Sequence, residues 1–334
     1  METRKKIFGA ECLFTALIAV YEVVTVLALF TDLFSGITIK QNILFSQSLI
    51  FVPTVLYLFI MRKHVKDIIW FRKFHPLTLL LLPPLVLFME PLITLLNAIS
   101  MLFVRNEISN AASALVDHNT LGTSLFFMAF LPCVIEELAY RGVMFGSFHE
   151  AGRLKAILMS GFLFGLMHMN FNQMCYAFVM GLFFAVVIYI TDNLTVSIAL
   201  HMLFNAFTVI LCCFPSTKVI RTLLECHIAG YHLFNPSVTN MQGGIEISLV
   251  LIGGVIAVVS MLIAGYLVFL IGKEEKEEKK EKEVYKTKEK KETGIRTVKR
   301  TVIPENSEKW KPNALFFAGS GLCILITILY EILI

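Results

Sequence analysis

Long runs of apolar residues constrain this chain more than any other feature. A run of about 18 or more predominantly apolar residues is a candidate membrane helix, because roughly 20 residues cross the hydrocarbon core of a bilayer. The composition agrees, since 57% of the residues are hydrophobic and only 16% are charged. The sequence therefore predicts an all-α polytopic membrane protein with about eight to nine transmembrane helices. The nine candidate spans are residues 7–30, 42–61, 77–104, 121–141, 154–170, 173–191, 194–214, 245–271 and 314–334.

Charge is concentrated in one segment of the sequence. Residues 272–313 hold fourteen Lys or Arg and ten Asp or Glu, which accounts for the whole formal net charge of +4. The rest of the chain is charge-poor and balanced, which excludes a soluble enzyme and a nucleic-acid binder with a basic face. We expect residues 272–313 to form a charged cytoplasmic linker. Glu and Lys four residues apart favour a solvated helix there, and the same composition equally permits disorder.

The loops between the candidate spans differ in their content of Lys and Arg. The N-terminus and the second, fourth and eighth loops are rich in basic residues, whereas the loops between them are poor. Basic loops stay on the cytoplasmic side of a membrane. This alternation predicts a cytoplasmic N-terminus, an integral membrane location and, with nine spans, a C-terminus on the opposite side. The turn at residues 191–193 is the one predicted inside loop that lacks a basic residue.

An ionisable residue within a predicted span indicates a structural or functional role, because placing each one inside the membrane costs at least about 2.5 kcal/mol. The fourth span ends in Glu136-Glu137-Leu-Ala-Tyr-Arg141. Glu137 and Arg141 are four residues apart, so they lie on one helical face and can form an ion pair. Glu136 lies about 100° round the helix from Glu137. A cytoplasmic charge cluster would explain Arg141 but would leave Glu136 without a role.

Two further spans carry histidines in the same part of the sequence. Gly161 and Gly165 form a small-residue face that lets a neighbouring helix approach closely, and His168 continues that face. His201 and Asn205 are four residues apart and project from one face of their helix. Each of these polar residues alone could be a hydrogen-bonding packing residue. Together with Glu136 they form a set on three helices that packing does not predict.

These residues favour hydrolysis of a bound carbonyl by water. Glu136 can accept a proton from water, and His168 can orient the same water. His201 and Asn205 can donate to the carbonyl oxygen as it becomes tetrahedral. A zinc site formed by Glu136, His168 and His201 is the alternative, although the sequence has no HExxH motif. Cys133, one turn before Glu136, is a weak candidate nucleophile.

At these residues the sequence resembles the CPBP family, the CAAX-prenyl-protease and bacteriocin-processing intramembrane proteases. The motifs of that family are Glu-Glu-x-x-x-Arg, Phe-x-x-x-His and His-x-x-x-Asn on successive membrane helices. In this sequence they are residues 136–141, 164–168 and 201–205. Each motif alone is weak, but all three occur in order within seventy residues.

The resemblance implies a role for each matched residue. Glu136 activates the hydrolytic water with His168 as its partner, His201 and Asn205 hold the oxyanion, and Glu137 and Arg141 support the site. The resemblance admits a peptide or prenylated-protein substrate and either a metal-free mechanism, which we favour, or a zinc-dependent one. It also admits a non-catalytic scaffold or a bacteriocin self-immunity protein. A transporter is a third possible function. It is disfavoured because the two halves of the sequence show no internal repeat.

The predicted depths of the site residues require an adjustment to the fourth span. Glu136 lies five residues from Arg141 and His168 lies thirteen from Lys155, a difference in depth of roughly 12 Å. We expect the fourth helix to continue past Arg141 towards Phe148. The predicted regions are the N-terminal helices at 1–120, the catalytic core at 121–214, an outside loop with the eighth helix at 215–271, the linker at 272–313 and the last helix at 314–334.

Overall fold

The protein is an all-α, multi-pass integral membrane protein, as its apolar runs predict. The computed structural model describes residues 2–100, 104, 115–116, 119–213, 247–293 and 313–333. Within these residues, seven helices are long and apolar enough to cross a membrane. Six of them lie in α1 (Glu2–Phe30), α2 (Ile39–Ile60), α4 (Pro76–Ser100), α10 (Phe171–Thr191), α11 (Leu194–Cys213) and α13 (Ile247–Thr293), and the seventh runs from Leu121 to Ala151. Helix α14 (Ala314–Leu333) contains a shorter apolar stretch, Phe316–Leu325.

The fourth span is one unbroken run of helical turns from Leu121 to Ala151. The expectation that it continues past Arg141 to Phe148 is confirmed, and residues 121–141 are too short a range for it. Gly146 permits this extension, because a Cβ there would lie 2.0 Å from the Ile68 carbonyl oxygen. Its segments are α6 (Leu121–Leu125), the π-helical η2 (Phe126–Phe130), α7 (Leu131–Glu137), the π-helical η3 (Leu138–Met144), α8 (Phe145–Phe148) and the 3-10 turn η4 (His149–Ala151).

The predicted span at residues 154–170 is shorter in the structure. Helix α9 (Arg153–Leu166) has 14 residues and ends two residues before His168. Its small-residue face is used as predicted, because it packs closely on α10. A Cβ at Gly181 of α10 would lie 2.8 Å from the Gly161 Cα, and a Cβ at Gly165 would lie 3.0 Å from the Met174 carbonyl oxygen.

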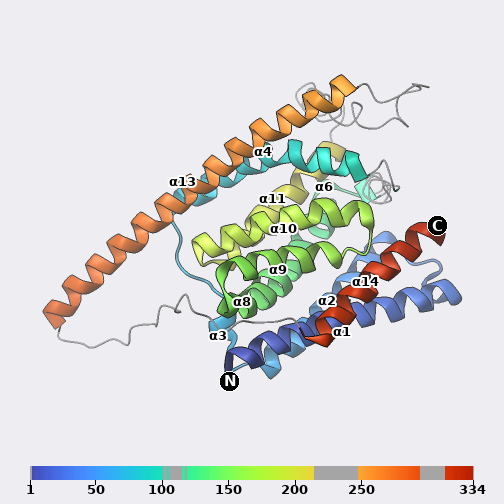
Figure 1. The fold of residues 1–334 in the computed structure, drawn as a ribbon, viewed down its shortest axis with the longest axis horizontal. Helices are drawn as coiled ribbons and strands as arrows, with labels where there is room; N and C mark the ends of the chain where they lie inside the picture. The colour runs from blue at the N-terminus through green and yellow to red at the C-terminus, as the bar shows by residue number, and fades with distance from the viewer. Residues whose placement is uncertain are drawn as a thin grey trace.

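The helices are arranged around α9, α10 and α11 (Figure 1). Helices α1, α2 and α14 lie together on one side of this central group, and α4 and α13 run alongside each other on the opposite side. Helix α2 also contacts α7 and η3, the segments that carry the Glu-Glu-x-x-x-Arg motif. The central helices therefore hold the motif residues between two outer groups.

Several loops that were predicted on the inside meet at one end of the bundle. Asp192, in the turn without basic residues, lies 2.8 Å from Arg72 Nη1 and 3.1 Å from Lys279 Nζ. Lys6 lies 2.7 Å from Glu150 and 3.4 Å from Asp67. The negative charge of Asp192 is thus paired with basic residues from other loops at the same end of the bundle. This agrees with the predicted alternation of basic and non-basic loops. The assignment of this end to the cytoplasm stays a prediction.

The charged segment begins as a helix that contacts the bundle. Helix α13 runs without interruption through the boundary predicted at residue 272 and extends beyond the other helices (Figure 1). The helical alternative is therefore confirmed for residues 273–293. Glu275 is buried, and its Oε1 accepts hydrogen bonds from the His75 backbone N–H and the Thr78 hydroxyl. Residues 294–312 and the predicted outside loop at residues 215–244 lie outside the described residues.

Candidate active site

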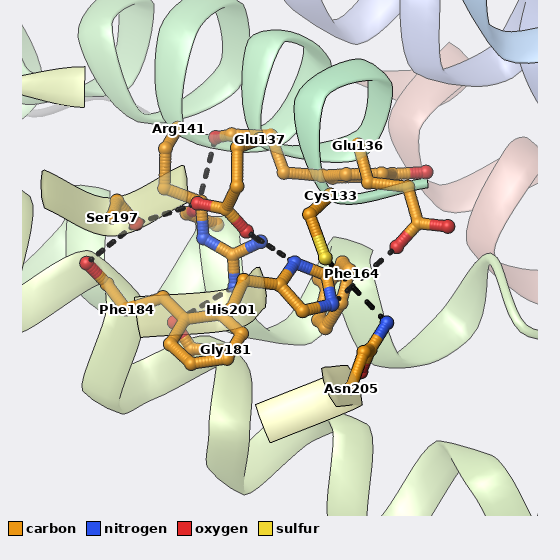
Figure 2. Close-up of polar contacts among 12 residues, drawn as sticks. Cys133, Glu136, Glu137, Arg141, Phe164, Gly181, Phe184, Ser197, His201 and Asn205 are labelled. Atoms are coloured by element: carbon orange, nitrogen blue, oxygen red, sulfur yellow. Dashed lines mark hydrogen bonds and ion pairs between the residues drawn. The ribbon is translucent and has the colours of Figure 1, made fainter. Parts of the chain in front are cut away.

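Glu137 is the centre of a fully buried hydrogen-bond cluster (Figure 2). Its carboxylate accepts from Arg141 Nη1 at 2.8 Å and from the Ser197 hydroxyl at 2.6 Å. The His201 Nδ1 atom lies 3.0 Å from Glu137 Oε1. The predicted ion pair with Arg141 is present, and α11 supplies the other two partners. These three partners fix the position of the Glu137 carboxylate, which has no contact with solvent.

Arg141 is held by charge, by a backbone carbonyl and by aromatic rings. Its Nη2 donates to the Gly181 carbonyl at 3.1 Å. Its guanidinium lies 4.2 Å from the Phe164 ring centroid and 5.1 Å from that of Phe184. Burying a charge is costly unless it is paired and hydrogen-bonded. Arg141 meets both conditions and also gains cation–π attraction, which makes a stable junction of α9, α10 and η3.

Glu136 has different surroundings from its neighbour. Its side chain is 14% exposed, whereas that of Glu137 is completely buried. Gln47 Nε2 donates to Glu136 Oε1 at 3.0 Å, and Glu136 Oε2 lies 4.0 Å from His201 Nε2. Figure 2 shows the two carboxylates on different sides of the His201 ring. The two adjacent carboxylates therefore differ, since Glu137 is buried with three partners and Glu136 is partly exposed.

His168 lies in the turn after α9, half-buried. Its Nδ1 is 2.7 Å from the Phe164 carbonyl oxygen. Because a carbonyl only accepts, Nδ1 carries the proton and the neutral ring has its lone pair on Nε2. The ring stands edge-on to Phe164, with centroids 4.9 Å apart. The His201 ring also stands edge-on to Phe164, with centroids 5.7 Å apart, so the two imidazoles pack on the same aromatic ring.

Asn205 faces the first turns of the fourth span. Its Nδ2 donates to the Met128 carbonyl at 3.0 Å and approaches the Cys133 Sγ at 3.5 Å. A thiol is a weak acceptor, so the second N–H is held loosely. His201 lies one turn earlier, stacked on Phe184 with centroids 4.8 Å apart. The predicted pair on α11 therefore lies beside the two glutamates of α7.

Two π-helical segments, η2 and η3, flank the short helix that carries the glutamates. The wide turns redirect side chains, and such turns occur frequently at functional sites. In each of them a backbone carbonyl accepts a side-chain donor from a neighbouring helix. Asn205 donates to Met128 in η2, and the Ser160 hydroxyl donates to Tyr140 in η3 at 3.0 Å. The irregular helix is thereby fixed at both ends of the Glu136–Glu137 pair.

Sequence reasoning missed several partners of the motif residues. Ser197 precedes His201 by one turn, so the helical period could have placed both on the same face. Gln47 interrupts the second apolar run, and an amide within a span is a signal of a buried hydrogen bond. Gly181 contributes only its backbone carbonyl, for which the sequence carries no signal.

The zinc alternative requires three ligands that converge on one point. Among the described residues, no group of three His, Cys, Asp or Glu side chains has an arrangement that could hold a metal ion. The residues as arranged do not fit the zinc site of Glu136, His168 and His201, so no step of the chemistry is routed through a metal.

The comparisons with known proteins concern the same part of the chain. Residues 119–207 match the family described as type II CAAX prenyl endopeptidase, Rce1-like. The chain is also 29% identical over 119 residues to the membrane-embedded CAAX protease MroQ of Staphylococcus aureus (strain USA300), a match that covers 34% of this chain and 48% of that protein. The chain thus spans about half the length of this relative. No solved structure matches.

These matches confirm the resemblance to the CPBP family of membrane proteases that the three motifs predict. The matched residues run from the turn before α6 to the middle of α11, and they include Glu136, His168, His201 and Asn205. Helices α1, α2, α4, α13 and α14 lie outside the matched family region.

Proposed function

We propose that the protein is an intramembrane endopeptidase in which Glu136 activates the water that hydrolyses a peptide bond. The contrast between the two adjacent glutamates carries this proposal. Glu137 has three polar side-chain partners and is buried, whereas Glu136 is 14% exposed and accepts one hydrogen bond, from Gln47, among the described residues. A carboxylate is expensive within a membrane. One that keeps acceptor capacity and access to the site is suited to act as a general base.

In the proposed reaction, Glu136 takes a proton from the water as its oxygen adds to the carbonyl carbon. His168 Nε2 accepts a hydrogen bond from the same water and fixes its direction. The tetrahedral intermediate then collapses, and Glu136 returns the proton to the leaving amine nitrogen. The scheme requires no cofactor, because the protein supplies both the proton acceptor and the proton donor.

His201 and Asn205 are the proposed donors to the oxyanion. The Asn205 N–H that faces the Cys133 sulfur gives up only a weak interaction when it turns to a substrate oxygen. His201 donates from Nδ1 to Glu137, so it offers a second N–H at Nε2 in its imidazolium form. The Glu137 carboxylate supplies the counter-charge for that form.

The proposed substrate is a peptide segment that reaches the interior of the membrane. A lipidated C-terminus, the leader of a secreted peptide and a segment of a membrane protein all meet this condition. The description of the relative as a CAAX protease makes a prenylated C-terminal peptide the first substrate to test. The lipid bilayer is the second proposed partner, because both the protein and its substrate lie within it.

A non-catalytic scaffold or self-immunity protein is the alternative function. Such a protein needs the buried cluster of Glu137 and Arg141 for its fold. It has no use for an accessible intramembrane carboxylate at Glu136, or for a second imidazole at His168. The endopeptidase accounts for all of these groups, and a cleavage assay separates the two functions.

The test uses the purified full-length protein with a quenched peptide and a prenylated peptide. Glu136→Gln and His168→Ala should each lower the cleavage rate by about 10²–10⁴-fold, the usual contribution of a general base or its partner. Both variants should keep the wild-type thermal transition in detergent. Full activity in either variant would refute the assignment of that residue.

A matched control removes a carboxylate elsewhere in the bundle. Glu22 of α1 is buried, and neither of its oxygens has a hydrogen-bond partner among the described residues. Glu22→Gln should therefore leave the cleavage rate within about twofold of wild type. Equal loss in Glu22→Gln and Glu136→Gln would indicate a general effect of membrane carboxylates on stability rather than chemistry at Glu136.

A further inference from the structure

Gln47 of α2 is the one side chain from outside the matched family region that hydrogen-bonds to Glu136 in the described structure. Its Nε2 donates to Glu136 Oε1 at 3.0 Å. The residue is 8% exposed, so this amide is almost removed from solvent. An N–H donated to a carboxylate is a charge-assisted hydrogen bond, which fixes direction as well as lowering energy. Glu136 is thereby held with its other oxygen towards His201.

The other end of the same amide is unsatisfied. Gln47 Oε1 is buried and has no hydrogen-bond partner among the described residues. A buried acceptor without a partner is costly, and in native proteins such atoms usually have a partner or a function. The hydrogen bond from Nε2 to Glu136 is therefore the one polar contact of this side-chain amide among the described residues, and it ties the buried amide to Glu136.

Helix α1 fixes the position of α2 next to Gln47. The Tyr21 hydroxyl donates to the Ser46 carbonyl at 2.9 Å, one residue before Gln47. Helix α2 also packs on α7 and η3. The amide of Gln47 is thus built into the interface between the N-terminal helices and the Glu-Glu-x-x-x-Arg segment, and does not reach it from a flexible loop.

We propose that Gln47 is a positioning residue of the active site, which orients the Glu136 carboxylate through Nε2. This inference rests on the proposed function of Glu136. Because Gln47 holds one oxygen of Glu136, the other oxygen, Oε2, is the one that takes the proton from the water. The site is then completed by a helix that the family match does not include.

The test is Gln47→Leu, which removes both the donor and the acceptor while keeping a side chain of similar bulk. Losing one hydrogen bond to a charged group should lower kcat by about ten- to a hundredfold. KM should stay within about twofold of wild type, because the amide contacts Glu136 and not the peptide. Gln47→Glu is the second variant, since it keeps the length of the side chain but places a second carboxyl group against Glu136, where the two must share a proton and Glu136 is less available as a base. It should also lower kcat by at least about tenfold.

Thr54→Val is the matched control on the same helix. Thr54 is buried two turns after Gln47, and its hydroxyl has no partner among the described residues. This variant should keep both kcat and KM. Wild-type kcat in Gln47→Glu, or in a stably folded Gln47→Leu, would overturn the inference. So would a change confined to KM, because it would assign Gln47 to peptide binding.

Glu136→Gln, measured alongside, separates this inference from the proposed function. An inactive Glu136→Gln with a fully active Gln47→Leu refutes the role of Gln47 and leaves the endopeptidase assignment standing. Equal cleavage by wild type and Glu136→Gln refutes the proposed function, and the inference fails with it.

Discussion

The Nδ1 atom of His201 lies 3.0 Å from Oε1 of Glu137, and both side chains are buried. Because the Glu137 carboxylate is an acceptor, this contact places a proton on Nδ1 and turns Nε2 towards Glu136, whose Oε2 lies 4.0 Å away. One imidazole therefore connects two adjacent glutamates that have different surroundings. The difference between the glutamates leads to opposite expectations for their substitution.

Glu137→Gln should destabilise the fold, whereas Glu136→Gln should not. Removing the charge of Glu137 leaves Arg141 buried without its partner, which costs about 3–5 kcal/mol in comparable pairs. Thermal unfolding in detergent, followed by circular dichroism or by aggregation, measures the difference. Cleavage should also fall in the folded fraction, because His201 loses its anionic partner. A transition of Glu137→Gln equal to that of wild type would contradict the supporting role of Glu137.

Gly181→Ala should loosen the packing of α9 on α10. The new Cβ would lie 2.8 Å from the Gly161 Cα and 3.1 Å from Arg141 Nη2, so the backbone or the guanidinium must move. Overpacking of this kind costs about 1–3 kcal/mol. The transition temperature should fall, and activity should fall with it if Arg141, which binds Glu137, supports the site as proposed.

Gly265→Ala is the matched control for this substitution. Nothing lies within 4 Å of a Cβ built at Gly265 in α13. The control should be neutral or slightly stabilising, because alanine favours a helix over glycine by about 1 kcal/mol. If both alanine variants behave alike, the close approach at Gly181 does not limit stability.

The sequence motifs identified the candidate site more completely than they located its helices. Spacing of four residues is a local property of a helix, so the Glu137–Arg141 pair could be predicted before any fold was known. The contacts of Gln47 and Gly181 join helices far apart in the sequence, and no local period encodes them. The continuation of the fourth helix to Ala151 could be inferred only because Glu136 and His168 had to reach similar depths.

The end of α9 shows why boundaries were harder to predict than residues. Apolar composition continues past Leu166, so hydropathy extends the span to residue 170. The chain instead turns, with Met169 at a positive φ of 45°, and α10 begins at Phe171 after an Asn170 cap. Positive φ is uncommon for a residue other than glycine. The predicted role of His168 does not depend on this boundary.

Chelation should leave cleavage unchanged. Among the described residues, the side chains proposed as zinc ligands do not form a three-ligand group, and the scheme proposed for Glu136 needs no metal. Prolonged dialysis against a strong zinc chelator should therefore preserve the rate within about twofold, while a zinc-dependent protease in the same detergent loses its activity. Loss of cleavage that added zinc restores would establish the metal-dependent alternative.

Glu275→Ala should separate the start of the charged segment from the bundle. Glu275 is buried, and its Oε1 accepts from the Thr78 hydroxyl at 2.6 Å and from the His75 backbone at 2.9 Å. These donors lie at the start of α4, where a carboxylate also interacts favourably with the helix dipole. Leaving buried donors unsatisfied costs about 1–3 kcal/mol. The transition temperature should fall, and protease sites within residues 273–293 should become more accessible.

Glu277→Ala tests whether this effect is specific to the buried contact. Glu277 lies two residues further along α13 and is exposed, so its loss changes the net charge of the segment by the same amount. It should leave the transition temperature and the protease pattern as in wild type. Equal effects of the two substitutions would show that the charge of the segment, and not the contact with α4, determines its stability. A fall confined to Glu275→Ala shows that α13 is anchored where it passes the end of α4.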